Sequence, residues 1–410
     1  MSWWPGLVAA LAAGGVVAEL ALRRANPWRL WRDAFDEAAA MTPHPSRGWM
    51  QRPGHAFRFH HRYLRQPVDI RFNRLGLHDA AEYAVAKEDG VFRVALMGCT
   101  TAVGWELPAD QTLASRLRQT LQARMPGRRV EVMNAAVRLY GTGQLYDFFD
   151  QEIAAYRPDL VLYYLNLNHP RRTITAHESG KSPLLSQPVW GLDSQGELTR
   201  VAVEPATHVN DMVFLDEDGT IRRQSGRTER SLHRWLLDRS HLYTWGDDLR
   251  QGPVRLRQWR DRVEIKDIEV RSLRDGVLGD VADLPYQWRI VARLLERWKA
   301  AAHAAGGRFV VAPHLTYYNV RDGALHKAVP QHPWGFTFDN IPERRYAAFL
   351  SERLGFPFLD TYAQARESLR DDVERYYVHP RYTYMTAEGA GFIAGILVDQ
   401  LEAAGVLPSA

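Results

Sequence analysis

Residues that could hydrolyse an ester follow three separate apolar segments of the chain. Cys99 and Thr100 follow the first segment, Asn134 lies at the end of the second, and Asn168 and His169 follow the third. Nucleophilic hydrolysis needs a hydroxyl or thiol, a base within hydrogen-bonding distance of it, and a third group that orients the base. A thiol, a hydroxyl, two amides and an imidazole supply parts of such a site, provided that the fold brings the three segments together.

The order of strands and helices in the sequence predicts that the fold brings these three segments together. Continuous apolar runs predict five strands, at residues 92–97, 130–136, 160–167, 309–312 and 356–359. Apolar residues at helical spacing predict helices at residues 110–125, 146–156, 285–305 and 387–404. Apolar strands that alternate with helices form parallel sheets covered on both faces, and function collects at the carboxyl ends of such strands. The predicted fold is a three-layer α/β/α sandwich around a five-stranded parallel sheet.

The blocks at these strand ends resemble the SGNH/GDSL hydrolase family in order and spacing. In that family the first block is Gly-Asp-Ser with a nucleophilic Ser, and the second carries an oxyanion-hole Gly after an Asn-Ala pair. The third carries an oxyanion-hole Asn, and the last is Asp-x-x-His. Matching segments of this chain lie at residues 18–23, 73–77, 104–105, 140–144 and 157–161. The resemblance covers nearly the whole chain and implies the flavodoxin-like SGNH fold.

The first three blocks depart from the family at the residues that do the chemistry. Thr100 stands at the nucleophile position, and Cys99 replaces the Asp before it. Ala136 stands at the oxyanion-hole Gly, which adds a methyl group where the oxyanion would sit. Asn168 is retained as the third-block Asn, but His169 follows it in place of the usual Asp.

The last block lacks both the base and the group that would orient it. Residues 385–389 match the segment that follows the family's His, and this register places Tyr384 at the His and Arg381 at the Asp. A tyrosine, with a pKa of about 10, cannot accept a proton near neutral pH as an imidazole does. Arginine cannot replace an acidic group that orients a base. The resemblance therefore implies a pseudoenzyme in which no catalytic set is intact.

Other uses of these residues stay open. A loop shift would bring His379 to the position of the base. Cys99 could act as a thiol nucleophile beside His169, or it could simply fill a strand end. A polar ligand could bind without turnover to Cys99, Thr100, Asn168 and His169.

Residues 1–24 predict a membrane anchor helix. The segment 3–22 is apolar except for Glu19. Its 20 residues, at about 1.5 Å each, span roughly the 30 Å of a bilayer core. Tryptophans lie at both ends of this segment, as in an aromatic belt: Trp3, Trp4, Trp28 and Trp31. A buried or interfacial helix is the alternative.

The side of the membrane is ambiguous. Four arginines follow the segment and none precedes it, which favours a cytoplasmic domain: Arg23, Arg24, Arg29 and Arg32. The family resemblance instead implies a periplasmic domain, attached to the bacterial inner membrane.

The rest of the chain is predicted to hold a β-rich extension at residues 25–90 and the hydrolase-like domain at 91–410. In the extension, alternating runs at residues 57–60 and 69–72 predict strands. An insertion at 170–284 interrupts the domain, with a hairpin at 214–221 that turns at Asp218 and Gly219, and a helix at 231–245.

The composition of the chain limits which partners, metals and disulfides are expected. The net charge is only +4 among 410 residues, so nucleic-acid binding has little support. The single cysteine excludes an internal disulfide and a Cys-based zinc site. His60 and His61 would point to opposite faces of a strand and are poor co-ligands for a metal. No metal or cofactor is predicted.

The sequence therefore predicts a non-catalytic, membrane-attached binding or structural subunit. Its expected partner is an integral membrane protein within a larger complex. The alternative is an active esterase or O-acetyl transferase that acts on a cell-envelope glycan, as the family resemblance would imply.

Overall fold

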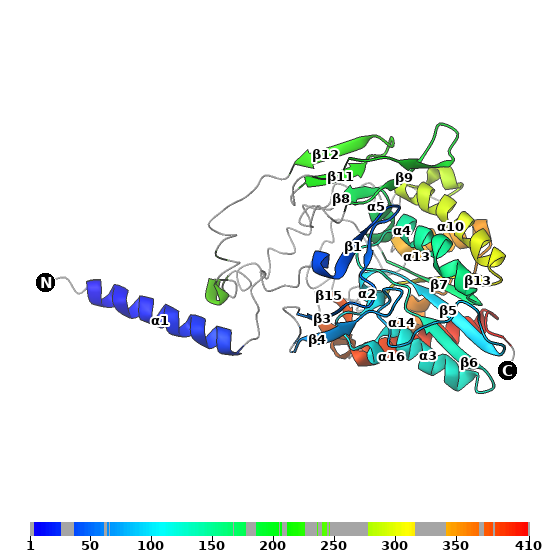
Figure 1. Cartoon of the computed structure of the whole chain (residues 1–410). Helices are drawn as coiled ribbons and strands as arrows, with labels where there is room; N and C mark the ends of the chain where they lie inside the picture. The colour runs from blue at the N-terminus through cyan, green and yellow to red at the C-terminus, as the bar shows by residue number, and fades with distance from the viewer. Residues whose placement is uncertain are drawn as a thin grey trace.

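The computed structural model describes residues 4–408 with gaps at 26–36, 61–63, 65, 167, 178–185, 205, 207–210, 226–235, 237–239, 244–245, 247–277, 316–341, 369–372 and 380–381. The described residues form a parallel sheet with helices on both faces, several short antiparallel strand pairs, and an N-terminal helix (Figure 1).

Four parallel strands form the central sheet. They are β5 (Val91–Met97), β6 (Arg129–Met133), β7 (Leu160–Leu165) and β13 (Arg308–Pro313), in the spatial order β6-β5-β7-β13. In chain order this reads 2-1-3-4, as in flavodoxin-like sheets. Every residue of β5 and β7 is buried, because helices cover both faces. The prediction of an α/β fold with a parallel sheet is confirmed.

The predicted fifth strand does not form as a strand. Residues 356–359 make one parallel bridge, between Phe358 and Val311 of β13. Val311 N–H donates to the carbonyl of Pro357 at 3.1 Å, and Leu359 N–H donates to the carbonyl of Val311 at 2.9 Å. Both bonds lie on the side of the segment that faces β13, where Pro357 has no N–H to give. The ladder therefore stops after one bridge, and the sheet has four strands.

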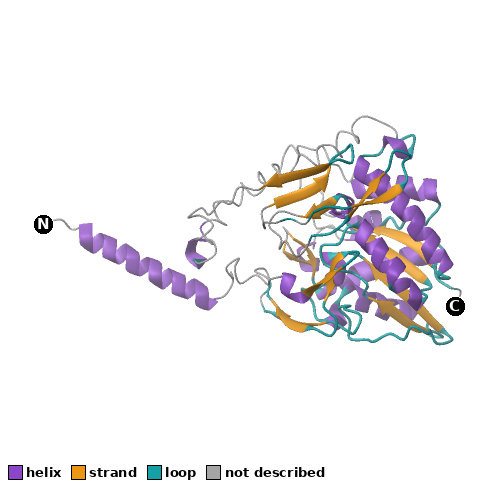
Figure 2. Cartoon of the chain, turned by 45° about the horizontal axis from the view of Figure 1, so that its top comes forward, coloured by secondary structure: helices purple, strands orange, loops and turns teal. Residues whose placement is uncertain are grey.

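Helices cover the two faces of the sheet (Figures 1 and 2). One face carries α3 (Leu113–Arg124) and α16 (Ala387–Ala403), which pack on each other, with α3 against β6. The other face carries α4 (Thr142–Gln151), α10 (Tyr286–Ala304) and α13 (Pro342–Leu354). The shorter helices include α14 (Thr361–Ser368), η3 (Ala109–Gln111) and η4 (Ile153–Tyr156).

Several tryptophans fill the core. Trp105, Trp288 and Trp298 are fully buried. The ring of Trp298, on α10, lies 4.9 Å from the ring of Tyr163 on β7 and 5.4 Å from that of Phe309 on β13. These rings therefore fasten α10 across two neighbouring strands.

The extension before β5 contributes to the same core. It contains η2 (Glu37–Ala40) and the antiparallel pairs β1 (Met41–His44) with β2 (Gly48–Gln51) and β3 (Ala56–Phe59) with β4 (Val68–Arg71). The strands predicted at 57–60 and 69–72 thus form. Trp49, Phe59 and Ile70 are buried in one cluster with the side chains of the sheet.

The segment 73–77, part of the family resemblance, forms a turn. Asn73 Oδ1 accepts hydrogen bonds from the N–H groups of Leu75 and Leu77, both at 2.9 Å. Gly76 has a φ of 77°, and a Cβ there would lie 2.4 Å from the carbonyl oxygen of Gln51. Backbone geometry therefore explains both the Asn and the Gly of this segment.

The insertion folds as short antiparallel strands. β11 (Asp211–Leu215) pairs with β12 (Ile221–Ser225) and with β8 (Thr175–His177), and β9 (Val189–Leu192) pairs with β10 (Leu198–Val201). The predicted hairpin forms, and Asp216 Oδ1 accepts the N–H groups of Asp218 and Thr220 in its turn. The helix predicted at 231–245 lies largely outside the described residues. The short helix η6 (Val281–Asp283) precedes α10.

The helix α1 (Trp4–Ala25) forms where the anchor was predicted and lies apart from the sheet (Figure 1). Among the residues that the structure describes, no helix has the length and apolarity to cross a membrane, which corrects the predicted transmembrane span.

Glu19, the one charged residue in the apolar segment 3–22, binds the insertion. Its carboxylate accepts hydrogen bonds from the Ser240 hydroxyl (2.9 Å) and from the N–H groups of His241 (2.9 Å) and Leu242 (2.8 Å). Burial raises the pKa of Glu19, but these bonds and one from Arg23 outweigh it and lower the pKa to about 2. Glu19 therefore joins α1 to the insertion as a carboxylate.

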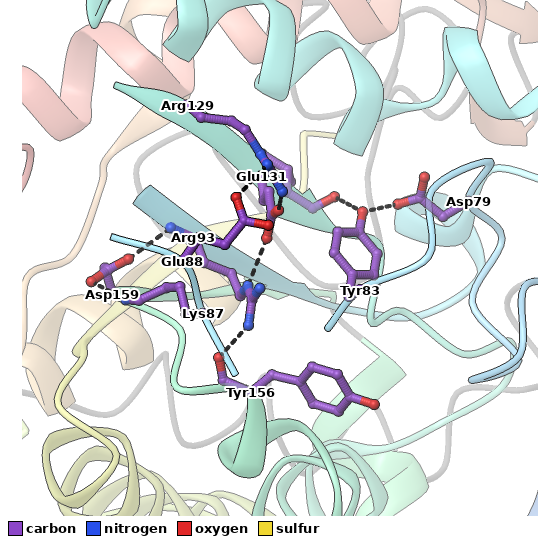
Figure 3. Close-up of polar contacts among 10 residues, drawn as sticks. Asp79, Tyr83, Lys87, Glu88, Arg93, Arg129, Glu131, Tyr156 and Asp159 are labelled. Carbon is purple, nitrogen blue, oxygen red and sulfur yellow. Dashed lines mark hydrogen bonds and ion pairs between the residues drawn. The ribbon is translucent and has the colours of Figure 1, made fainter. Parts of the chain in front are cut away.

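Ion pairs fasten the amino ends of the central strands (Figure 3). Arg93 of β5, buried, donates to Glu131 of β6 at 2.8 Å and to the carbonyl of Tyr156 at 2.7 Å. Asp159, just before β7, accepts from Arg93 N–H at 2.7 Å and from Lys87 Nζ at 2.5 Å. These contacts join three neighbouring strands at the end of the sheet opposite the polar blocks.

We predict that Glu131→Gln costs about 3 kcal/mol of unfolding free energy near neutral pH, because it leaves the buried Arg93 without its charged partner. Glu88→Gln is the matched control: Glu88 also pairs with Arg129 but is 67% exposed, so its loss leaves the urea midpoint unchanged.

Burial raises the pKa of Glu131, but hydrogen bonds from Arg129 and Arg93 lower it overall. The contribution of the ionised form is thus present above the unfolded pKa and is lost as the pH falls through the folded pKa. Urea titrations at neutral and acidic pH check this: the gap between wild type and Glu131→Gln narrows in acid. Equal losses in the two variants would contradict it.

Candidate functional site

The carboxyl ends of the strands leave the sheet at one edge. Met97 of β5 pairs with Tyr163 of β7, and Leu165 of β7 pairs with Pro313 of β13. The described residues that follow these strands therefore lie next to one another: Gly98–Thr101, Asn166, Asn168, His169 and His314.

Thr100 begins the short helix α2 (Thr100–Val103), directly after β5. Its hydroxyl oxygen accepts a long hydrogen bond, 3.4 Å, from the N–H group of Leu139. Leu139 has a φ of 67°, a left-handed conformation that is unusual for a residue with a side chain. Such outliers cluster at binding and catalytic sites, and this one points a backbone N–H at the position of the family's nucleophile.

Cys99, before Thr100, is almost completely buried, at 2% exposure. Burial raises the pKa of its thiol. The thiol therefore stays protonated near neutral pH and does not supply a thiolate nucleophile. Cys99 thus fits the simpler of its two interpretations, a small residue that fills the strand end.

The residues of the second block, Asn134 and Ala136, form hydrogen bonds to neighbouring parts of the fold. Asn134, fully buried, donates from Nδ2 to the carbonyls of His78 at 3.1 Å and Val103 at 3.2 Å. Ala136 is also fully buried, and its carbonyl accepts a bond of 3.4 Å from Gln51 of β2. This block therefore joins the sheet to α2 and to the N-terminal extension.

Asn166, at the end of β7, organises the third block. Its Oδ1 accepts the N–H group of Asn168 at 2.9 Å, and its Nδ2 lies 2.9 Å from Nδ1 of His314. A backbone N–H can only donate, so it fixes which end of the amide is the oxygen. The amide of Asn166 therefore donates to His314, whose Nδ1 must be unprotonated. Asn168 itself is the first residue of α5 (Asn168–Thr173) and is half-buried.

A backbone N–H also determines the tautomer of His169. Its Nδ1 accepts the N–H group of Asn166 at 3.2 Å and lies 2.8 Å from the hydroxyl of Tyr163. Nδ1 therefore carries no proton, and the tyrosine must donate to it. Tyr163 in turn lies 2.9 Å from the hydroxyl of Thr142, which is then the donor of that pair.

The remaining proton of His169 is consequently on Nε2. His169 is fully buried, and its Nε2 has no hydrogen-bonding partner among the described residues. Burial is the main cause that holds the pKa of His169 well below its usual value, with Arg172 and His314 contributing. His169 is therefore a neutral hydrogen-bond donor and is not available as a base.

The fourth block lies beside the first. β14 (Tyr377–His379), which follows α15 (Val373–Tyr376), pairs with β15 (Tyr382–Met385), and β15 contacts α2. Tyr384 is half-buried on β15. Arg381 and the side chain of His379 lie outside the described residues, so their predicted roles stay predictions.

The match of residues 385–389 to the family has a structural cause. Thr386 caps α16, because its Oγ1 accepts the N–H group of Gly389 at 3.0 Å. A Cβ at Gly389 would lie 2.0 Å from the carbonyl oxygen of Tyr376. The cap and the close approach require a threonine-like side chain and a glycine at these positions, whatever the chemistry of the site.

Three residues of this network have no role in the sequence-based prediction: Tyr163, Asn166 and His314. His314 comes two residues after the end of the strand predicted at 309–312, so the rule that points to the first three strand ends points to it as well. Nothing in the sequence distinguishes Tyr163 from the other apolar residues of its strand. Within the described residues, no group of three or more His, Cys, Asp or Glu side chains could hold a metal ion.

No family model and no curated protein matches the chain. Its likenesses among solved structures include a lipase/acylhydrolase from Enterococcus faecalis, at 10% identity and a TM-score of 0.37, over 78% of this chain and 99% of that chain. A structure described as a GDSL-like lipase, from Parabacteroides merdae, has 12% identity and a TM-score of 0.36, over 77% and 96%. A catalytic mutant of an acetylxylan esterase from Geobacillus stearothermophilus has 10% identity and a TM-score of 0.38, over 76% and 94%. Likenesses this remote establish neither a family nor an activity.

We predict that His169 keeps one neutral tautomer, with the proton on Nε2, from about pH 5 to about pH 8. Long-range ¹H–¹⁵N spectra of the imidazoles check this, since the two nitrogens have distinct shifts in each state. Tyr163→Phe removes one donor to Nδ1 and costs about 1 kcal/mol of stability, yet it leaves the tautomer unchanged because the N–H of Asn166 remains. A proton on Nδ1, or titration near the usual histidine pKa, would overturn the assignment.

Proposed function

We propose that this chain is a catalytically inactive, SGNH-hydrolase-like protein that works by binding. The observation that carries the proposal is the state of the imidazoles at the strand ends. Nδ1 of His169 and Nδ1 of His314 are each occupied as acceptors, by the backbone of Asn166 and by its amide. A base for Thr100 needs an unprotonated nitrogen within reach of the hydroxyl, and neither Nδ1 is free for that role.

The groups around Thr100 support the same conclusion. Its hydroxyl oxygen accepts a backbone N–H, which leaves the hydroxyl proton without a histidine acceptor in the described contacts. At the family's base position stands Tyr384, whose phenol does not accept a proton near neutral pH. The donors at this edge remain suited to holding a polar group in place without breaking a bond.

The proposal includes a partner, which we infer to be an integral membrane protein. Helix α1 exposes Leu11, Val16, Val17 and Leu20 by 59–68%. Small residues repeat at every fourth position of the helix, at Gly6, Ala10, Gly14 and Ala18. A Cβ at Gly6 or Gly14 would meet no atom within 4 Å. Such a helix leaves apolar area in contact with water unless another surface covers it, and small residues let a second helix approach closely. We propose that an apolar helix of the partner covers α1 and so places the protein at the bacterial inner membrane.

We predict that a fluorophosphonate probe does not label the protein and that a short-chain aryl ester is not hydrolysed above the background rate. The reason is the missing base for Thr100. Gel fluorescence and intact mass measure the labelling. Stoichiometric modification of Thr100, abolished by Thr100→Ala, would refute the proposal.

The control for this prediction restores the family residues in one variant: Cys99→Asp, Thr100→Ser, Ala136→Gly, Arg381→Asp and Tyr384→His. The changes lie at strand ends and loops, so we expect the variant to fold with reduced stability, since Cys99 and Ala136 are buried. Labelling of this variant, but not of wild type, shows that the probe reaches the site and that the missing residues are the cause.

We predict that the full chain sediments with membranes of its host and that deletion of residues 1–24 releases it in folded form. Val17→Asp places a charge on the exposed face of α1 and abolishes the sedimentation, because a buried unpaired carboxylate is costly. Arg24→Asp, beyond the apolar segment, is the matched control and keeps it. Fractionation followed by immunoblotting measures the outcome. Sedimentation of all three variants would rule out α1 as the attachment surface.

A further inference from the structure

The segment at residues 78–90 lies along one edge of the central sheet. It leads into β5 and has no regular secondary structure. Among the described residues, β6 is the outermost strand on its side and pairs with β5 alone. Glu88 of the segment pairs with Arg129 at the amino end of β6, and the carboxyl group of Asp79 accepts the N–H group of Asn134 just beyond its carboxyl end. This segment, which we call the strap, therefore covers an edge strand with its side chains.

The phenol of Tyr83, in the middle of the strap, lies between two oxygens (Figure 3). The phenol oxygen is 2.5 Å from Oδ2 of Asp79 and 2.8 Å from the carbonyl oxygen of Val132 on β6. A carbonyl and an ionised carboxylate can only accept, and a phenol has a single proton. With Asp79 ionised, one of the two contacts would therefore bring two oxygens together without a proton between them. Both contacts are hydrogen bonds if Asp79 is a carboxylic acid that donates to Tyr83, because the phenol proton then goes to Val132.

The surroundings of Asp79 favour this protonated form. Burial raises the pKa of its carboxyl group, and this outweighs four weaker effects that lower the pKa, those of Tyr83, Ala81, Arg118 and Asn134. Three of the four are hydrogen bonds, and the fourth is the charge of Arg118 on α3. A carboxyl group whose charged form is penalised more by burial than it is stabilised by its partners keeps its proton to a higher pH.

Two further titratable groups face the pair. His78, next to Asp79, donates from Nδ1 to the carbonyl of Val103 at 2.9 Å, and burial lowers its pKa to about 4, so it is neutral near neutral pH. Burial is the main cause that raises the pKa of Tyr83, and the charges of Asp79 and of Glu131 on β6 add to it. Tyr83 therefore keeps its proton, and Asp79 is the member of the pair that titrates.

We propose that Asp79 and Tyr83 form a proton-dependent latch that holds the strap on β6. In the closed latch, the O–H of Asp79 donates to the phenol oxygen of Tyr83, and the phenol donates to the carbonyl of Val132. When Asp79 gives its proton to water, its carboxylate becomes an acceptor, the phenol turns to it, and the bond to Val132 breaks. The latch closes as the pH falls and opens as it rises. This inference goes beyond the proposed function and does not depend on it.

The latch is connected to the strand-end edge through Asn134. The backbone N–H of Asn134 bonds to Asp79, and its Nδ2 donates to the carbonyls of His78 at 3.1 Å and Val103 at 3.2 Å. Val103 is the last residue of α2, the helix that begins with Thr100. A change of charge on Asp79 therefore reaches the helix at the position of the family's nucleophile, and the latch links the position of α2 to pH.

Carbon-13 spectra of the full-length protein, labelled at the valine carbonyl and aspartate carboxyl carbons, test the latch between about pH 4 and about pH 8. We expect Asp79 to titrate above the ordinary aspartate pKa, and the carbonyl carbon of Val132 to move upfield with the same midpoint as its hydrogen bond is lost. Asp79→Asn donates to Tyr83 at every pH, so Val132 stays at its acid position. Tyr83→Phe keeps Val132 at its alkaline position throughout. Asp89→Asn, exposed in the same strap, is the matched control and leaves both titrations unchanged.

Urea titrations over the same pH range give an independent measure. Because the folded pKa of Asp79 is raised, the contribution of its protonated form to stability is fully present below the unfolded pKa and is lost as the pH rises through the folded pKa. The unfolding constant of the wild type therefore increases relative to that of Asp79→Asn as the pH rises, about tenfold for each pH unit between the two pKa values.

Titration of Asp79 at the ordinary pKa, or a Val132 resonance that does not follow Asp79, would overturn the proposal. A wild-type protein that loses no stability relative to Asp79→Asn as the pH rises would overturn it as well. If Tyr83→Phe does not fold, the two midpoints in the wild type and the fixed resonance in Asp79→Asn decide the matter.

Discussion

Two backbone N–H groups at the end of β7 determine the chemistry of the whole strand-end edge. The N–H of Asn166 bonds to His169 Nδ1, and the N–H of Asn168 bonds to Asn166 Oδ1. A backbone N–H cannot reverse its role, so the first bond fixes the tautomer of one histidine. The second orients the amide that meets the other histidine. The geometry with which the chain leaves a parallel strand thus turns two residues with the capacity for base catalysis into hydrogen-bond donors.

The residues that match the family and those that depart from it fall into two physical groups. Asn73 and Gly76 make a turn, and Thr386 and Gly389 cap a helix that approaches another backbone closely. Gly98 belongs with them, since a Cβ there would lie 2.6 Å from Cβ of Ala102. Packing demands all of these whatever the protein does. The departures, at Thr100, Ala136 and Tyr384, stand at the positions where the family has its nucleophile, its oxyanion-hole glycine and its base. A chain that keeps the first set and lacks the second retains the parts that the fold needs, which is the pattern that the proposed loss of hydrolysis would leave.

Much of the fold followed from hydrophobic pattern alone, because a buried parallel strand must be apolar along its length. The four strands and the helices α3, α4, α10 and α16 are of this kind, whereas α13 has no counterpart in the sequence-based prediction. The prediction of a fifth strand at 356–359 was wrong for a local reason: Pro357 has no N–H to donate on the side of the segment that faces β13. The site was harder to predict. Cys99, Thr100, Asn168 and His169 were predicted from the strand ends, and the structure places them there. The part that Tyr163 and Asn166 play depends on which atoms form hydrogen bonds, and sequence spacing does not carry that information.

Helix α1 shows how one charged residue can change the meaning of an apolar segment. As a sequence it predicts a bilayer span, in which Glu19 is a tolerated exception near the end. In the fold, Glu19 is the point of attachment, with four donors from two separate parts of the chain. Its pKa is lowered to about 2, so the attachment contributes stability above the unfolded pKa of about 4.5 and loses it only as the pH falls through about 2. The contact is therefore insensitive to pH in the range in which cells live. Any surface that covers the apolar faces of α1 meets a helix already joined to the insertion, so binding at α1 and the position of residues 240–242 are mechanically linked.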